Sequence, residues 1–283
     1  MYPAPIARDP WMQTGYRLAL LLSLGFWLLP IFAVAFTSIR SLEDIQRGNL
    51  WGWPTDPSLF GNYAEVLTDS AMHQFIENSS LITAPAVAAT IALSVMAAFA
   101  LAKYRFPGRS ALLAVFIAGN LAPAQVLMVP VRDLVVNTLG IYDTRFALIL
   151  FHTAFQTGFC TLLLHGFVRR VPNALIEAAR LDGVSELRIF CSIVVPLLRP
   201  AMAAAAVLIF TFVWNDYFWS LMLVQSDDVR PVTAGLQSLR GMWVASWHLV
   251  SAAAIIAAIP PVVLFFFMQK HFIAGLTSGA VAE

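Results

Sequence analysis

The sequence predicts an all-α membrane protein with six transmembrane helices, because its composition is strongly apolar and six apolar stretches are long enough to span a bilayer. Of the 283 residues, 59% are hydrophobic and 12% are charged, and the mean hydropathy is +0.76. Soluble domains contain about 45–50% apolar and about 25% charged residues. With a net charge of +1, this composition excludes a water-soluble globule, a disordered chain and a basic nucleic-acid-binding protein. Membrane lipid is therefore an expected partner, and nucleic acid is not.

Six apolar stretches reach the length of about 20 residues that a helix needs to cross about 30 Å of hydrocarbon. They cover approximately residues 18–39, 80–102, 111–131, 146–168, 201–224 and 247–268. The first stretch is too long for the apolar core of a signal peptide, and no convincing small-residue cleavage site follows it. We interpret it as an uncleaved span, so that residues 1–283 form a single transmembrane domain.

The alternating loops between these spans differ in charge. Eleven Lys and Arg residues lie on the side that holds both termini, and six lie on the opposite side. The first side carries five acidic residues and the second carries ten, with Asp216 inside a span. Loops rich in Lys and Arg face the cytoplasm, so both termini are predicted to be cytoplasmic.

The external segment over residues 40–79 is longer than a simple connection requires. It contains Trp51, Trp53, Pro54 and Pro57. Tryptophans at this place are typical of an interfacial aromatic belt followed by a turn. A docking surface for an external partner is the alternative, and the residues alone favour neither interpretation.

The internal segment over residues 169–200 is predicted to form a helical hairpin outside the membrane. Pro172 and Asn173 are start signals for a first helix, and Gly183 suits the left-handed backbone position that ends it. Ser185 is able to cap a second helix. The second helix has one apolar stripe and is closed by two prolines before the next span; the stripe and the prolines comprise Leu187, Phe190, Cys191, Val194, Val195, Pro196 and Pro200.

The first helix of this hairpin offers small residues and one acid. Ala178 and Ala179 permit close approach by another surface, and Glu177 is placed to meet a cation there. The alternative is a hairpin that lies at the membrane interface and only anchors the loop. From the residues alone, these two interpretations have equal weight.

The residues of this segment resemble the EAA loop of the permease subunits of ABC importers. The family pattern is E-A-A-x-x-x-G, followed at a fixed distance by I-x-L-P. Here it reads Glu177-Ala178-Ala179, then Gly183, then Ile193-x-Val195-Pro196, with Val in place of Leu. The motif Trp214-Asn215-Asp216-Tyr217 and the tail Gly275 to Val281 are similar to those of maltose-type carbohydrate permeases, specifically the six-span subunit. The final Ala282-Glu283 departs from the Lys-Gly of that family.

This resemblance implies a carbohydrate uptake system in the bacterial inner membrane. A second, homologous permease subunit would complete the path, two cytoplasmic ATPase subunits would power it, and a periplasmic binding protein would deliver the solute. The loop over residues 40–79 would be periplasmic and the EAA loop over residues 169–200 would be cytoplasmic. The resemblance assigns ATPase coupling to Glu177, Ala178, Ala179, Asp182 and Gly183.

The chain contains no G-x-x-x-x-G-K-[ST] phosphate-binding loop. It is therefore expected to be a non-catalytic subunit without a cofactor of its own, with ATP and Mg²⁺ bound by the partner ATPases. The scattered histidines show no ligand spacing, so no metal site is expected.

Polar residues inside the spans are candidates for a solute path. Asp216 is the one acid within a span, and near a helix centre it would cost about 2.5–3.5 kcal/mol to insert. The predicted path consists of Asn120, Gln125, His152, Gln156, Asn215, Asp216 and Trp219. Carboxylates and amides beside aromatic rings suit the hydroxyls and C–H faces of sugars. Hydrogen bonding between helices is the alternative role for each polar group.

Prolines are expected to interrupt two spans. Pro123 and Pro130 should break span three locally, because proline has no amide hydrogen for the helical ladder. The pair Pro260-Pro261 should mark a kink in span six.

Two other functions were weighed. In a secondary transporter, Asp216 and His152 would relay protons, but no internal repeat is visible and the internal loop is unusually long. An intramembrane enzyme lacks support, since the chain has no G-x-S-x-G motif, metal-ligand cluster or paired carboxylates within a span. The sequence does not identify the solute beyond a carbohydrate or a sugar derivative.

Overall fold

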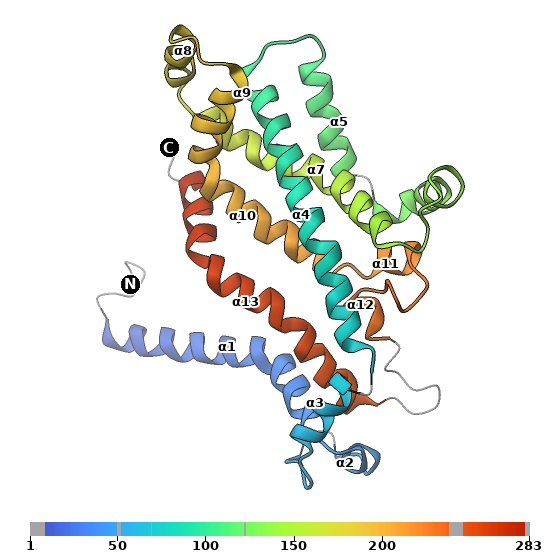
Figure 1. The fold of residues 1–283 in the computed structure, drawn as a ribbon. Coiled ribbons are helices and arrows are strands. Elements are labelled where there is room, and N and C mark those ends of the chain that lie inside the picture. Colours follow the sequence, from blue (N-terminus) through green and yellow to red (C-terminus); the bar gives the residue numbers. More distant parts are fainter. Residues whose placement is uncertain (1–8, 50–51, 69, 122, 238–245, 281–283) are drawn as a thin grey trace. The chain divides into compact units, whose positions relative to one another are not determined.

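The computed structural model describes residues 9–49, 52–68, 70–121, 123–237 and 246–280, with residues 124 and 270–280 described by their backbone alone. Within these residues the chain is helical, and one bridge between Arg40 and Pro57 is the sole extended pairing (Figure 1). The longer helices are α1 (Pro10–Ser38), α3 (Leu59–Thr68), α4 (Met72–Lys103), α5 (Arg109–Leu121), α7 (Arg145–Arg170), α8 (Asn173–Leu181), α10 (Val195–Trp214) and α13 (Trp247–Ala280). The shorter elements are α2 (Leu42–Gln46), η1 (Ala124–Leu127), α6 (Met128–Asp133), η2 (Leu134–Thr138), α9 (Glu186–Ile189), η3 (Phe190–Val194), α11 (Phe218–Leu223) and α12 (Val232–Gly235).

Five helices in the described part of the chain are long and apolar enough to cross a membrane. They are Pro10–Ser38, Met72–Lys103, Arg145–Arg170, Glu186–Trp214 and Trp247–Gln269. A sixth crossing is present if Arg109–Leu121 and Gln125–Thr138, which are bent by 96° at a short break, form one span. The break lies beside Pro123, as the sequence predicted, whereas Pro130, also expected to interrupt this span, lies inside the first turn of α6. The all-α, six-span fold class is confirmed, with its third member broken.

Span five starts earlier than predicted. Pro196 and Pro200 were expected to close the hairpin, yet the helix is continuous from Glu186 to Trp214. It passes through the π-helical turn η3, in which the amide of Val195 donates to the carbonyl of Phe190. A π-helical turn is one of the adjustments by which apolar helices tolerate proline. The second helix of the hairpin and span five are therefore one element.

Span five also ends earlier than predicted. Helix α10 stops at Trp214, and residues 215–217 separate it from the short helix α11. The predicted span over residues 201–224 is therefore two helices with a break at Asn215, Asp216 and Tyr217. The pair Pro260-Pro261, in contrast, lies within the continuous helix α13.

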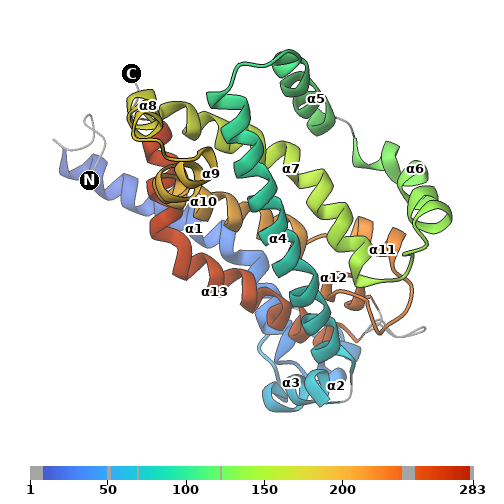
Figure 2. The same ribbon diagram turned by 45° about the horizontal axis from the view of Figure 1, so that its top comes forward.

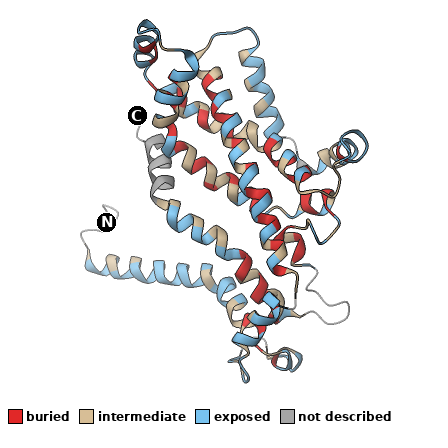
Figure 3. Cartoon of the chain, viewed as in Figure 1, coloured by how far each residue is buried: buried red, intermediate tan, exposed pale blue. Residues whose placement is uncertain are grey.

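The chain divides into two compact units, and each is described by itself. One contains Met1–Ser70 and Ser238–Ile256, and the other contains Ala71–Gln237 and Ala257–Glu283. In the second unit, α4 packs along α7, α10 packs against both, and α5 packs against α7 (Figures 1 and 2). The buried residues of this unit gather where α4, α7 and α10 meet (Figure 3).

Small residues allow this close helix packing, as is usual where lipid provides no hydrophobic drive for association. The hydroxyl of Ser94 on α4 donates to the carbonyl of Thr157 on α7 at 3.1 Å. Next to it, Gly158 faces α5 so closely that a Cβ would lie 3.1 Å from the Asn120 Nδ2 atom. A Cβ at position 158 would therefore require the Asn120 side chain to shift by a few tenths of an ångström.

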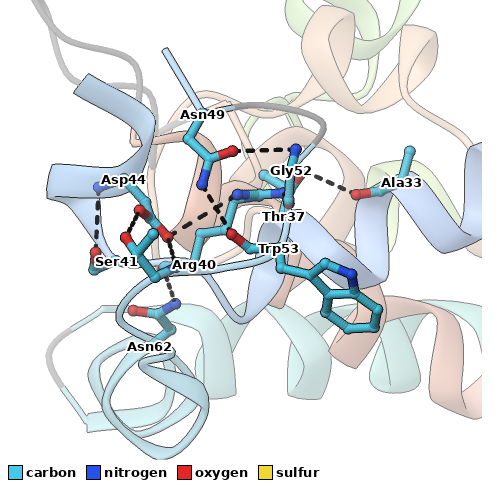
Figure 4. A network of polar contacts seen from close by, with 10 residues as sticks. Ala33, Thr37, Arg40, Ser41, Asp44, Asn49, Gly52, Trp53 and Asn62 are labelled. Carbon is cyan, nitrogen blue, oxygen red and sulfur yellow. Dashed lines mark hydrogen bonds and ion pairs between the residues drawn. The ribbon is translucent and has the colours of Figure 1, made fainter. Parts of the chain in front are cut away.

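In the first unit, the chain after α1 folds around the side chain of Arg40 (Figure 4). Arg40 is 1% exposed, donates to the carbonyl of Gly52, and lies 4.0 Å from the Asp44 carboxylate. The amide of Asn62 donates to the carbonyls of Ser38 and Arg40 at 2.8 and 2.7 Å. The hydroxyl of Thr55 donates to Asp44 and holds the pKa of that carboxyl below its usual value.

This network shapes the external segment, within which Trp53 packs edge-to-face on Phe36 with ring centroids 5.4 Å apart. Trp51, the other tryptophan of the predicted belt or docking surface, lies outside the described residues.

Candidate functional site

The hairpin predicted within residues 169–200 turns at Gly183, as the sequence predicted. Helix α8 begins at Asn173 and ends at Leu181, and Gly183 has a φ of +76°. The amide of Gly183 donates to the carbonyl of Arg180, and the amide of Val184 donates to that of Ala179, both at 3.0 Å. These two bonds form a Schellman motif, which ends a helix through a left-handed residue. A residue with a Cβ would be strained at position 183.

The residues assigned to coupling separate into an outer and an inner group. Glu177, Ala178, Asp182 and Gly183 are exposed, whereas Ala179 is 9% exposed and belongs to the buried core of the chain. Ala179 therefore packs internally, and of the two alanines only Ala178 offers a small surface to a partner. The outer face also includes Leu181, which is 89% exposed and which the sequence analysis did not single out.

A polar cluster holds the two arms of the hairpin together. The guanidinium of Arg180 donates to the carboxylate of Glu186 across the turn, with Nε and Oε1 2.5 Å apart. The hydroxyl of Tyr104, which follows α4, donates to the same carboxylate. Burial, together with the Glu186 charge, raises the pKa of Tyr104, and Glu186 also raises the pKa of Arg180. Both donors thus keep their protons at neutral pH.

The end of α4 also contacts the start of the hairpin. The ammonium of Lys103 donates to the carbonyl of Val171 at 2.6 Å and to the Oδ1 atom of Asn173 at 2.8 Å. Sequence reasoning missed both Lys103 and Tyr104. They lie about 70 residues before the hairpin, and no local pattern connects the two segments.

The inner face of the second arm differs from the predicted stripe. Val194 is buried, and Phe190 packs on Phe99 of α4 with centroids 5.4 Å apart, but Leu187 and Cys191 are exposed. Ile189 is buried in their place. Apolar residues occupy both sides of this arm, so their spacing alone did not select the buried side. Ser185 stands at the start of the arm but makes no side-chain capping bond.

The break in span five is organised by Asp216. Its carboxylate accepts from the amides of Trp219 and Ser220 at 3.2 and 3.0 Å, and from the Ser220 hydroxyl at 3.1 Å. These bonds satisfy amides in the first turn of α11 that have no helical partner. The Oδ2 atom also lies 3.6 Å from the Nε2 atom of His152 on α7. Asp216, predicted to lie inside a span, thus lies just after the long helix that ends at Trp214, and these partners all belong to this chain.

Aromatic rings pack beside this break. Trp219 is 4% exposed and lies on Phe151 of α7, with ring centroids 3.9 Å apart. Buried in this way, Trp219 offers no open ring face to a solute in this conformation. The predicted aromatic platform is instead part of the packing between α7 and α11.

The other predicted path residues do not join this cluster. Asn120, Gln125 and Asn215 are exposed, and Gln156 is half-buried one turn after His152 on α7. The amides of Asn120 and Asn215 donate to Phe116 and Thr211, one turn back in their own helices, at 2.7 and 2.9 Å. Among the described residues, no hydrogen bond connects Asn120, Gln125 or Gln156 to Asp216.

Comparison with known families shows which family this chain belongs to. A family model described as the binding-protein-dependent transport system inner membrane component matches residues 90–278. The chain belongs to this family. The permease is thus a transport subunit and not an enzyme, which confirms the expectation drawn from the EAA-like loop.

Curated relatives extend over nearly the whole permease. It is 35% identical to an osmoprotective compounds uptake permease protein of Synechocystis, over 96% of this chain and 93% of the relative. It is 34% identical to a melibiose/raffinose/stachyose import permease protein of Bacillus subtilis, over 89% and 91%. It is 30% identical to a sulfoquinovosyl glycerol transport system permease protein of Agrobacterium fabrum, over 90% and 88%.

Solved structures share the fold. A chain of a bacterial ABC transporter involved in import of the acidic polysaccharide alginate has a TM-score of 0.80 at 23% identity, covering 96% of this permease and 99% of that chain. A second alginate transporter structure, in complex with a pentasaccharide-bound periplasmic protein, gives 0.66 at 16% identity, covering 91% and 94%. Of the tail that resembles the family, Gly275 to Ala280 lie in the backbone of α13, whereas Val281 and the departing Ala282-Glu283 lie outside the described residues.

Proposed function

We propose that this permease pairs with a second permease subunit and two cytoplasmic ATPases to import a carbohydrate or sugar derivative delivered by a periplasmic binding protein. The family supports dependence on a binding protein. The names of the relatives support a sugar-like solute, since they include melibiose, raffinose, stachyose and sulfoquinovosyl glycerol. The excess of Lys and Arg on one side supports an inner-membrane orientation with both termini and residues 169–200 in the cytoplasm, and residues 40–79 in the periplasm.

The observation that carries the coupling role is the exposed tip of the hairpin. Glu177, Ala178, Leu181 and Asp182 face outward around a turn whose backbone only Gly183 adopts without strain. An apolar side chain as exposed as Leu181 is typical of a surface that a partner covers. In our proposal an ATPase cleft receives α8 here, and ATP with Mg²⁺ is bound entirely by the ATPases.

Motion at the tip has two routes into the permease. One is the unbroken helix from Glu186 to Trp214, because η3 joins the hairpin to span five. The other is the end of α4, where Lys103 and Tyr104 contact both arms of the hairpin. A rigid hairpin with these contacts would transmit a rigid-body shift to spans two and five.

For the solute path we propose Asn120, Gln125, Gln156 and Asn215 as the residues that a second permease would face, since three are exposed and the fourth is half-buried. In this proposal the break in span five is held by contacts of Asp216, His152 and Trp219, which lie behind the residues that line the path. This supporting role of Asp216 replaces the direct solute binding expected from the sequence, because the carboxylate already accepts three hydrogen bonds from α11.

The test uses the importer assembled in proteoliposomes with its binding protein. Candidate solutes are melibiose, raffinose, stachyose and sulfoquinovosyl glycerol, each radiolabelled. Gly183→Val should abolish uptake and binding-protein-stimulated ATP hydrolysis while the subunit still inserts. Gly183→Asn should retain most activity, because Asn tolerates the left-handed region. Gly108→Val, also at a positive φ (+86°) but outside the hairpin, is the matched control for backbone strain. Normal uptake by Gly183→Val, or by a double replacement of Glu177 and Gly183, would refute the coupling role.

A proton-driven transporter is the second candidate, favoured by the 3.6 Å contact between His152 and Asp216. It predicts uptake that collapses with an uncoupler and is indifferent to vanadate. The ATP-driven importer predicts the opposite pattern in the same vesicles.

A further inference from the structure

The proline pair in α13 creates an unmatched hydrogen-bond acceptor. Proline has no amide hydrogen, so Pro261 is unable to donate to the carbonyl of Ala257, four residues earlier in the helix. In an apolar environment a backbone carbonyl without a donor is costly. The structure provides a donor for this carbonyl from another span.

That donor is Trp214. Its indole Nε1 atom donates to the Ala257 carbonyl at 3.1 Å, and the side chain is buried. The ring is also stacked on Phe210, one turn back in α10, with centroids 5.4 Å apart and planes inclined by 13°. Trp214 is the last residue of α10, directly before the break that contains Asn215 and Asp216. The bond therefore joins the end of span five to the proline site of span six.

The break in span five is thus fixed from two directions. On one side, the Trp214 indole donates to α13. On the other, Trp219 packs on Phe151 with the ring planes inclined by 34°, and Asp216 lies beside His152, with both partners on α7. The first contact is unusual because its acceptor has no helical donor, since Pro261 interrupts the hydrogen-bond ladder of α13.

We propose that the hydrogen bond from Trp214 to the Ala257 carbonyl is a positioning contact that transmits movement between spans five and six during transport. The inference rests on the proposed ATP-driven function. A hairpin shift reaches the end of α10 through the continuous helix from Glu186. The indole then passes it to α13, so that loss of the N–H group leaves the ATPases docked but poorly coupled to the path.

The experiment uses importers in proteoliposomes that carry Trp214→Phe, Pro261→Ala or both. Trp214→Phe keeps an aromatic ring and removes the donor. Pro261→Ala supplies an amide that satisfies the Ala257 carbonyl within α13 while Trp214 stays available. Trp27→Phe, at a tryptophan of α1 that is exposed in this chain, controls for the loss of an indole. Two quantities are measured. One is the Tm of the complex, and the other is the factor by which the binding protein stimulates ATP hydrolysis by the ATPases. The binding protein is used with the solute that it retains on purification.

Trp214→Phe should lower the Tm and reduce the stimulation about fivefold or more, as expected when one net hydrogen bond is lost from the coupled state. Adding Pro261→Ala should restore the Tm but not the stimulation. Pro261→Ala and Trp27→Phe alone should both stay near the wild-type stimulation.

Three results would overturn the proposal. Recovery of stimulation together with Tm in the double variant would mean that the indole merely satisfies a buried carbonyl. Loss of this stimulation in the single variant Pro261→Ala would show that coupling requires the proline itself and not the hydrogen bond from Trp214. Stimulation of ATP hydrolysis at the wild-type level in Trp214→Phe would show that the contact has no role in coupling. If the wild-type importer itself shows no vanadate-sensitive stimulation, the proposed function fails, which is a distinct outcome.

Discussion

The Nε2 atom of His152 and the Oδ2 atom of Asp216 lie 3.6 Å apart, where α7 passes the break between α10 and α11. The same carboxylate accepts two backbone amides of α11. An intramembrane acid with these partners supports a helix start and a contact between spans, which are structural tasks. Its position at the break between α10 and α11 also means that these contacts determine the course of the chain there.

We expect Asp216→Ala to lower the free energy of unfolding by about 1–2 kcal/mol, because two first-turn amides of α11 lose their acceptor. The half-saturating concentration of solute should change less than about twofold, since ΔG of solute binding is unaffected. Chemical denaturation in detergent and uptake kinetics measure the two quantities. Asp228→Ala, at an exposed carboxylate that accepts from Gln74, is the control. A large rise in the half-saturating concentration would instead make Asp216 a solute ligand.

The contact between Arg180 and Glu186 supports a second prediction. Both side chains are more than one-third exposed, so Glu186→Gln should change the free energy of unfolding by at most about 1 kcal/mol. Binding-protein-stimulated ATP hydrolysis should nevertheless fall by about two- to fivefold, because the two arms of the hairpin are less rigidly joined. Glu43→Gln, in the exposed pair of Glu43 with Arg47, should leave hydrolysis unchanged. Equal effects from the two variants would contradict a role for the hairpin contact.

Asp143 gives a pH-dependent prediction. Burial alone would raise the pKa of its carboxyl, but the amides of Gln225 and Ser226 and the charge of Arg230 outweigh burial and hold the pKa below its ordinary value. A lowered folded-state pKa stabilises the protein above the unfolded value of about 3.9, and this stability is lost as the pH falls through the folded value. Asp143→Asn should therefore lower the Tm at pH 7 and approach the wild type near pH 3. A difference in Tm between the two proteins that stays constant from pH 7 to pH 3 would show that the charge of the Asp143 carboxylate does not contribute to stability.

The buried amide of Asn62 supports a prediction for the first unit. Asn62→Leu leaves the carbonyls of Ser38 and Arg40 without this donor and should cost about 2–4 kcal/mol. Limited proteolysis within residues 40–57 should accelerate accordingly. Asn49→Leu, at an exposed amide that donates to the carbonyl of Trp53, should have a smaller effect. Similar cleavage rates for the two variants would show that Asn62 does not hold this segment.

The parts predictable from sequence are those that depend on neighbouring residues. Gly183 was identified because a left-handed backbone at a helix end is a local requirement, and its φ of +76° agrees. The break at Pro123 was likewise local. In contrast, the expectation that Pro196 and Pro200 end the hairpin is wrong, because a π-helical turn precedes Pro196, Pro200 lies inside α10, and no residue pattern predicts such a turn.

The contacts that connect separate spans were not predictable. Tyr104 meets Glu186, and Trp214 meets Ala257, across 82 and 43 residues of sequence. Asp216 was recognised as unusual, but its roles at the start of α11 and beside His152 depend on how the helices pack. Spacing along one helix carries no information about such partners.

An ATPase subunit is proposed to bind the tip of the hairpin. The most direct test places a photoreactive p-benzoylphenylalanine at the position of Leu181 in the assembled importer. Phe60, 87% exposed on α3 of the other unit, is the matched control position. We predict that irradiation attaches the ATPase subunit to position 181 and not to position 60. Attachment of lipid alone at position 181, or of no partner, would contradict the account.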